Sequence, residues 1–132
     1  MDLKDLTPTA DIIVVEITHP TTGDILENED GSAMTISRYA PHSKEYKSVL
    51  NKETDKKLKM SQAKKKFTFT ADDLEKTNLH LLSKTTFDWN ITFGGEMPKF
   101  SIDAARDLYE EVFWIRDQLE EAESDYLDFT KA

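Results

Sequence analysis

Residues 100–129 read FSIDAARDLYEEVFWIRDQLEEAESDYLDF, and this stretch decides the fold more than any other part of the chain. Its apolar residues recur at alternating steps of three and four positions, which is the period of a helix. The residues on this line are Ala105, Leu108, Val112, Ile115, Leu119, Ala122 and Tyr126. Charged residues, nearly all acidic, fill the other face of the helix. The stretch therefore predicts one long helix or a pair of helices with one apolar face.

A second apolar line, formed by Tyr109, Phe113 and Trp114, lies beside the first. Most aromatic residues at helical spacing belong to a core. However, Phe113 and Trp114 are adjacent and point about 100° apart on a helix, so burying both requires a wide apolar face or a partner. We therefore predict a partner-binding or oligomer-forming face. The face comprises Leu108, Tyr109, Phe113, Trp114, Ile115 and Leu119.

Short apolar runs near the N-terminus predict strands. Residues 12–17 (IIVVEI) are mostly β-branched and apolar, and residues 33–39 (AMTISRY) alternate, with turn residues at positions 19–24 and 28–31. We therefore predict an α+β fold, dominated by helices, with an N-terminal β-hairpin or small antiparallel sheet. The predicted organisation is a single domain over residues 1–132, with a flexible segment at 1–10, a β-hairpin region at 11–40, a helical region at 44–132 and a loop at 87–100.

Capping residues mark where the predicted helices begin. Ser43 can cap the helix that follows it. The apolar stripe of this helix disappears over residues 51–57, so we expect that stretch to be solvated and to fray or break. Thr70 and Asp73 resemble a capping box, with Phe69 placed to pack on Leu74. The helix that follows is predicted to bury Leu74, Leu81 and Leu82. Residues 87–93 alternate and suit a short strand or an extended arm, Gly94 and Gly95 form a turn, and Ser101 caps the last helical stretch.

Composition excludes several classes of protein. The chain has 132 residues, of which 38% are hydrophobic and 33% charged, so it is not disordered by composition. No apolar run approaches the roughly 18 residues that span a bilayer, and the N-terminus lacks the apolar region of a secretory signal. The absence of cysteine excludes disulfides and thiolate chemistry and suits a reducing cytoplasm.

The net charge of -9 is unevenly distributed. Residues 44–66 carry nine lysines against three acids, whereas residues 103–132 carry ten acids against three basic residues. This division favours internal or intersubunit pairing of a basic segment with an acidic one. Nucleic-acid binding is the less favoured interpretation, because the rest of the chain repels phosphates. The lysines that could steer a partner electrostatically are Lys52, Lys56, Lys57, Lys59, Lys64, Lys65 and Lys66.

No catalytic or metal-binding pattern is recognisable. His19, His42 and His80 share no metal-ligand spacing, and the serines lack a nucleophile-elbow motif. The paired acids near the C-terminus lie on a solvated helix face without an apolar pocket that would raise a carboxyl pKa. We therefore predict a binding protein without a cofactor or metal rather than an enzyme.

Several short motifs, in this order and spacing, resemble the small tail assembly chaperones of long-tailed bacteriophages. They are residues 18–24 (THPTTGD), 43–46 (SKEY), 83–86 (SKTT) with Trp89, 100–109 (FSIDAARDLY), 113–119 (FWIRDQL) and Phe129. The chain departs from the family pattern at Asn90, where a glycine is usual, and at Phe113, where a proline is common. Loss of that proline would allow the last two helices to fuse.

The resemblance implies a non-enzymatic role in the host cytoplasm. Such proteins bind the tape measure protein, keep it soluble and help tail tube subunits polymerise around it, and they are absent from the finished virion. The tape measure protein and the tail tube protein are the implied partners, and self-association into a homo-oligomer is a further use of the apolar face. Many genes of this family also encode a longer, frameshifted product.

Two other functions remain open at this level. A head-tail joining or tail completion protein would be a structural component of the virion. A nucleic-acid-binding regulator would use the lysine segment, and its binding would be strongest at low salt.

Overall fold

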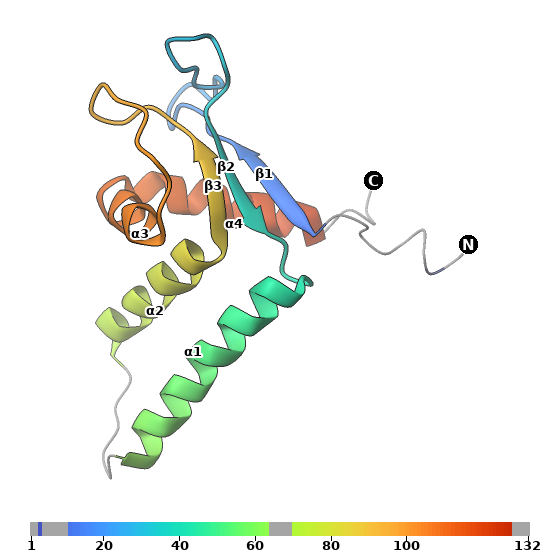
Figure 1. Ribbon diagram of the computed structural model, residues 1–132, viewed down its shortest axis with the longest axis vertical. Helices are drawn as coiled ribbons and strands as arrows, with labels where there is room; N and C mark the ends of the chain where they lie inside the picture. The colour runs from blue at the N-terminus through green and yellow to red at the C-terminus, as the bar shows by residue number, and fades with distance from the viewer. Residues whose placement is uncertain (1–2, 4–10, 64–69, 128–132) are drawn as a thin grey trace.

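The computed structural model describes residues 3, 11–63 and 70–127, and it confirms a helix-dominated α+β fold. Within these residues, three strands form one antiparallel sheet in the order β1-β2-β3, and four helices surround one of its faces and one of its ends (Figure 1). The elements in chain order are β1 (Ile12–Glu16), β2 (Thr35–Tyr39), α1 (Lys44–Ala63), α2 (Ala71–Lys84), β3 (Thr86–Asn90), α3 (Ile102–Glu111) and α4 (Phe113–Leu127).

The sheet has one covered face and one open face because its side chains alternate. Val15 pairs with Ile36, and both side chains are buried against α4, which crosses behind the sheet (Figure 1). Ile12 and Val14 on the same strand point the other way and are exposed. The predicted N-terminal hairpin is thus present, with Gly23 and Gly31 at positive φ in its connecting turns.

The third strand comes from the segment that we predicted as a loop. Within residues 87–100, β3 continues to Asn90 and pairs with β2, so the loop prediction is wrong for these positions. Of the two alternatives for residues 87–93, the short strand is the observed one. Trp89 lies opposite Ile36 on the covered face, and its indole N–H donates to the Pro98 carbonyl over 2.9 Å.

The helix starts follow the predicted caps. Thr70 and Asp73 form the capping box at α2, the Ser101 hydroxyl accepts from the Ala104 N–H at α3, and the Ser43 hydroxyl accepts from the Tyr46 N–H at α1. Phe69, predicted to pack on Leu74, lies outside the described residues. The helix α1 runs without a break through residues 51–57, where Glu53 turns inward and pairs with Lys84 at 3.1 Å.

The core lies between the covered face of the sheet and helices α2, α3 and α4. Leu79 and Leu82 of α2 contribute to it, whereas Leu74 is 48% exposed. The prediction that Leu74 is buried is therefore wrong, because α2 packs through its C-terminal half, leaving its first turns at the surface. The buried core residues are Val15, Ile17, Ile36, Leu79, Leu82, Ile91, Ala105, Leu108, Tyr109, Ile115 and Leu119.

The last two helices do not fuse, although proline is missing at position 113. Val112 ends α3 with φ -101° and ψ 69°, and α4 begins at Phe113. The Val112 N–H still donates to the Leu108 carbonyl, and the Val112 carbonyl accepts from the Ile115 N–H. The break redirects the chain so that both helices turn their first apolar line toward the core.

Candidate functional site

The structure divides the six residues of the predicted partner face. Leu108, Tyr109, Ile115 and Leu119 are buried in the core. The prediction that these four offer surface to a partner is wrong, because the sheet and α2 together cover a wider part of α3 and α4 than one apolar line. Trp114 is half-buried, and Phe113 is 65% exposed. The two adjacent aromatic residues are what remains of the predicted face.

Tyr109 is an example of a residue of the predicted face that belongs to the core. Its side chain is buried, and its hydroxyl lies 2.7 Å from the Thr86 hydroxyl at the start of β3. Burial raises the pKa of Tyr109 to about 12. Tyr109 therefore joins α3 to the sheet.

Trp114 lines an apolar cleft of about 300 Å³ between the hairpin, the segment after β3, and the last two helices. We call this cleft the Trp114 groove. Its lining residues are Ile17, Leu26, Met34, Ile91, Thr92, Phe93, Leu108, Val112, Trp114 and Ile115. Phe93, 42% exposed, stands at its mouth. The groove is thus walled almost entirely by apolar side chains and remains open.

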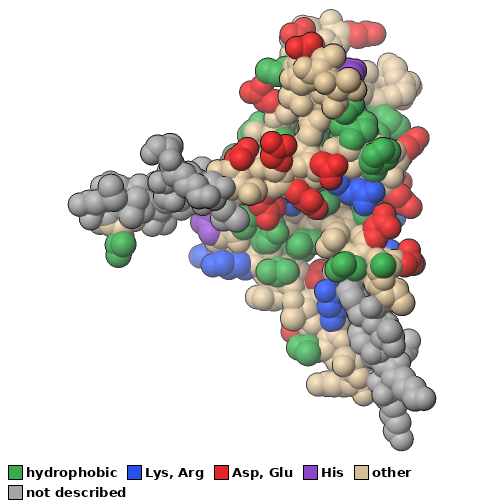
Figure 2. Space-filling model, turned by 180° about the vertical axis from the view of Figure 1, so that it is seen from behind, with side chains coloured by type: hydrophobic (Ala, Val, Ile, Leu, Met, Phe, Trp, Pro, Cys, Tyr) green, Lys and Arg blue, Asp and Glu red, His purple; other side chains and the backbone are tan. Residues whose placement is uncertain are grey.

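Acidic residues flank the Trp114 groove on both sides. A depression of about 200 Å³ shares Ile91, Phe93 and Leu108 with the groove and is bordered by Asp107 and Glu111. On the other side of Trp114, a depression against the turn at residues 18–23 is bordered by Asp117 and Glu121. Seen from behind, the molecule carries many acidic side chains on its surface, with hydrophobic ones exposed among them (Figure 2). The surroundings thus favour a partner with apolar and basic side chains.

Phe113 belongs to a different surface. It lies with Leu74 in a shallow depression of about 310 Å³ between α2 and α4. Glu75, Asp117 and Glu120 border this depression, and Arg116 crosses it to pair with Glu75 at 3.3 Å. We call it the Phe113 groove. Phe113 and Trp114 therefore serve two separate surfaces, as their angular separation on the helix requires.

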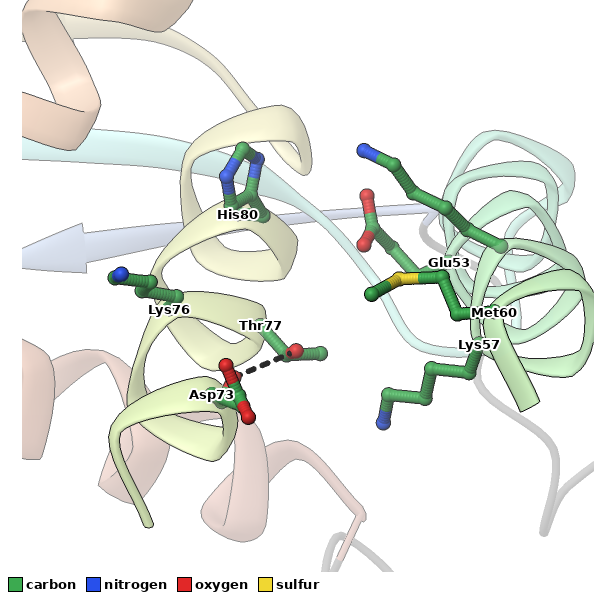
Figure 3. A pocket seen from close by; sticks show the side chains of 8 residues that line it. Glu53, Lys57, Met60, Asp73, Lys76, Thr77 and His80 are labelled. Carbon is green, nitrogen blue, oxygen red and sulfur yellow. Dashed lines mark hydrogen bonds between the residues drawn. The ribbon is translucent and has the colours of Figure 1, made fainter. Parts of the chain in front are cut away.

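The predicted lysine segment is only partly described. Lys52, Lys56 and Lys59 are exposed on α1, Lys57 is half-buried, and Lys64, Lys65 and Lys66 lie outside the described residues. Lys56 and Lys57 line a groove of about 240 Å³ between α1 and α2, where Met60 faces Thr77 and His80 across the gap (Figure 3). Glu53 and Asp73 also line this groove, so it mixes both signs of charge.

The three histidines lie in different parts of the structure and make different contacts. His19 holds its own turn, because its Nδ1 accepts from the backbone N–H groups of Thr21 and Thr22. His42 stacks on Tyr126 and lies 3.2 Å from Asp11, and His80 borders the α1–α2 groove. Across residues 3, 11–63 and 70–127, no group of three or more His, Cys, Asp or Glu side chains is placed to hold a metal ion. Likewise, no helix in that part of the chain is long and apolar enough to cross a membrane.

Sequence reasoning missed most of the Trp114 groove. Leu26, Met34, Ile91 and Phe93 come from segments far from Trp114 in the chain. The apolar alternation of residues 87–93 was a signal for part of it, but only the pairing of β3 with β2 brings that segment beside α4.

Comparisons of the chain with protein-family models, with curated proteins and with solved structures find no match. The site itself and the motif resemblance are therefore what bear on the function of this chain.

Proposed function

We propose that the protein is a phage tail assembly chaperone, which binds the tape measure protein, keeps it soluble and promotes polymerisation of the tail tube around it. The observation that carries the proposal is the Trp114 groove, an open apolar cleft with acidic borders. A tape measure protein made of long, apolar-patterned helices would place apolar side chains in such a groove, as helix-in-groove recognition requires. The protein would act in the host cytoplasm and would leave before the virion is complete.

The motifs behind the resemblance support this proposal, because several of them meet at the groove. Trp114 belongs to residues 113–119, and the turn at residues 18–24 lies against it. Trp89 borders the adjoining depression and contacts Phe100 edge to face, with 5.2 Å between the ring centres. Residues that carry the family likeness thus build the surroundings of one surface.

Co-expression with the tape measure protein tests the proposal. We expect the tape measure protein to be soluble with the native chain and to aggregate without it. Phe93→Ser and Trp114→Ala should each weaken the complex about tenfold or more, because anchor residues of an interface contribute about 2 kcal/mol. Leu58→Ser is the matched control, since Leu58 is 55% exposed on α1, away from the groove.

Equal solubility of the tape measure protein with and without the chain would refute the proposal. Mass spectrometry of purified virions gives an independent check. A chaperone is absent from them, whereas a head-tail joining or tail completion protein is present at a fixed copy number.

A further inference from the structure

The apolar surface of the Trp114 groove continues on the other side of Phe93. The groove and the neighbouring depression of about 200 Å³ are both lined by Ile91, Phe93 and Leu108, so the two adjoin. The further apolar lining residues of the depression are Trp89, Pro98 and Ala104. The two hollows together form one apolar trough, with Phe93, 42% exposed, as a ridge between two subsites.

The ridge at Phe93 is held by a network of side-chain amides. The Asn28 side chain, almost fully buried, donates to the Asn90 carbonyl over 3.3 Å and accepts from the Thr92 hydroxyl over 2.6 Å. Asn90, where the family pattern usually has a glycine, donates in turn to the Ser32 hydroxyl over 3.1 Å. The segment that leads to Phe93 is thus tied to the hairpin, and the trough is preformed. Binding to a preformed surface costs less conformational entropy than binding that has to order it.

The acidic residues around the trough all belong to one of its walls. On α3, Asp107 and Glu111 lie four residues apart and border one end, where Arg106 is 4.0 Å from Asp107. On α4, Asp117 and Glu121 have the same spacing and border the other end. The opposite wall, formed by the hairpin and the segment after β3, contributes no acidic lining residue within the described part of the chain. A partner in the trough therefore meets negative charge on one side only.

A helix is the form of peptide that suits this trough. Because the lining is apolar, a peptide that enters it has to satisfy its own backbone N–H and C=O groups, and a helix does so internally. Helical residues three or four positions apart lie on one face, so successive apolar side chains can fill the subsites on both sides of Phe93. Lysine or arginine side chains on one flank of that helix would then face the acids of α3 and α4.

We propose that the trough holds one amphipathic helix of the partner, with its basic side chains confined to the flank that faces α3 and α4. Turning such a helix end for end moves its basic flank to the opposite wall. The one-sided charge therefore sets the direction in which the helix lies, which apolar contact alone leaves undecided. This inference rests on the proposed function and adds the form, charge and direction of the segment that the tape measure protein contributes.

Synthetic peptides and a charge reversal test the proposal. The probes are fluorescently labelled peptides of about 18 residues, long enough to form a helix in isolation, with leucines on one face and either lysines or glutamates along one flank. We expect the native chain to bind the lysine peptide at least about tenfold more tightly than the glutamate peptide, measured by fluorescence anisotropy at about 50 mM salt. The variant Glu111→Lys with Glu121→Lys should reverse this preference, and Phe93→Ser should weaken binding of the lysine peptide.

The direction of the bound helix is measured separately. A spin label at the N-terminus of the lysine peptide broadens the NMR signals of nearby residues of the chain. We expect broadening at one end of the trough only, either around Ala104 or around Thr21. When the lysines are moved to the opposite flank of the peptide, the broadening should move to the other end.

The control variant is Glu110→Lys with Asp125→Lys, which changes the charge of the same two helices at exposed positions that border none of these hollows. It should keep the native preference, and circular dichroism confirms that each variant is folded. Equal binding of the two peptides by the native chain, reversal by the control variant, or broadening at the same end for both flanks would overturn the proposal.

Failure of this inference is distinguishable from failure of the proposed function. If the tape measure protein is soluble only with the native chain but the lysine peptide does not bind, the chaperone function stands and the helix proposal is wrong. If the lysine peptide binds as expected but the tape measure protein aggregates in the presence of the native chain, the chaperone function is wrong.

Discussion

At the scale of single residues, the buried guanidinium of Arg38 needs a carboxylate partner. It is buried on the covered face of the sheet, where Nη1 lies 3.2 Å from Glu123 Oε2 and Nη2 donates to the Thr85 hydroxyl at 2.8 Å. Tyr46 donates to the other oxygen of Glu123 over 3.3 Å. Among the residues that the structure describes, Arg38 Nε has no hydrogen-bond partner. A buried guanidinium depends on its carboxylate, because removing one member leaves the other charge uncompensated.

Glu123→Ala should therefore destabilise the fold by about 3 kcal/mol, measured by urea denaturation at pH 7. Glu121→Ala is the control, since Glu121 is exposed on the same helix, and it should change the free energy of unfolding by less than about 0.5 kcal/mol. Adding Arg38→Met to Glu123→Ala should recover part of the loss, because the unpaired charge is then gone. Equal stability of Glu123→Ala and Glu121→Ala would show that Arg38 does not need its partner.

Tyr109 makes the fold sensitive to high pH. Its pKa is raised from 10.0 to about 12 by burial, so the unfolded chain releases this proton at lower pH than the folded chain. The stabilisation from the raised pKa is complete below pH 10 and is lost as the pH rises toward 12. The slope due to this one proton is about 1.4 kcal/mol per pH unit.

Tyr109→Phe should remove that slope while costing about 1 kcal/mol at pH 7 through the lost hydrogen bond to Thr86. Urea denaturation of both proteins between pH 7 and pH 11.5 measures the effect. The difference in their free energies of unfolding should shrink above pH 10 and reverse its sign before pH 11.5. Parallel curves over the whole range would contradict this account of Tyr109.

At the scale of elements, the side-chain amide of Gln118 joins α4 to the hairpin through two hydrogen bonds to the Thr18 backbone. The Thr18 N–H donates to Gln118 Oε1 at 3.0 Å, and Gln118 Nε2 donates to the Thr18 carbonyl at 2.8 Å. One side-chain amide thus satisfies both backbone groups of a residue just beyond β1. This pairing links two of the motifs that carry the family resemblance, residues 18–24 and residues 113–119.

Gln118→Glu should destabilise the fold by about 1–2 kcal/mol at pH 7, because the carboxylate keeps the acceptor but loses the donor and faces a carbonyl oxygen. The free energy of unfolding from urea denaturation is the readout. Gln62→Glu, the same chemical change at an exposed position of α1, is the control and should have little effect. If both variants unfold alike, the Gln118 amide contributes nothing to the junction.

At the scale of the whole molecule, the fold separates charge and divides its exposed apolar surface. The basic helix α1 projects on one side of α2, and acidic α3 and α4 lie on the other (Figure 1). The first turn of α1 meets α4 through the hydrogen bond from Tyr46 to Glu123, and α2 lies between the later turns of α1 and the Phe113 groove.

The elements themselves could be predicted from the sequence, because their signals are local. The recurrence of apolar residues every three or four positions over residues 105–126 predicted the inner face of α3 and α4. Two helix starts were marked by Thr70, Asp73 and Ser101. The alternation of residues 33–39 predicted β2. Such features depend on backbone geometry and on neighbours within one or two turns, so they need no knowledge of the rest of the chain.

Only the tertiary structure decided which apolar residues stay accessible. Tyr109 and Phe113 lie four residues apart on one predicted line, yet one is buried and the other is 65% exposed, because the chain turns at Val112 between them. The Trp114 groove likewise exists only because β3 returns to the sheet after two helices and brings Ile91 and Phe93 beside α4. Accessibility depends on contacts between segments distant in sequence, and a periodic pattern does not contain that information.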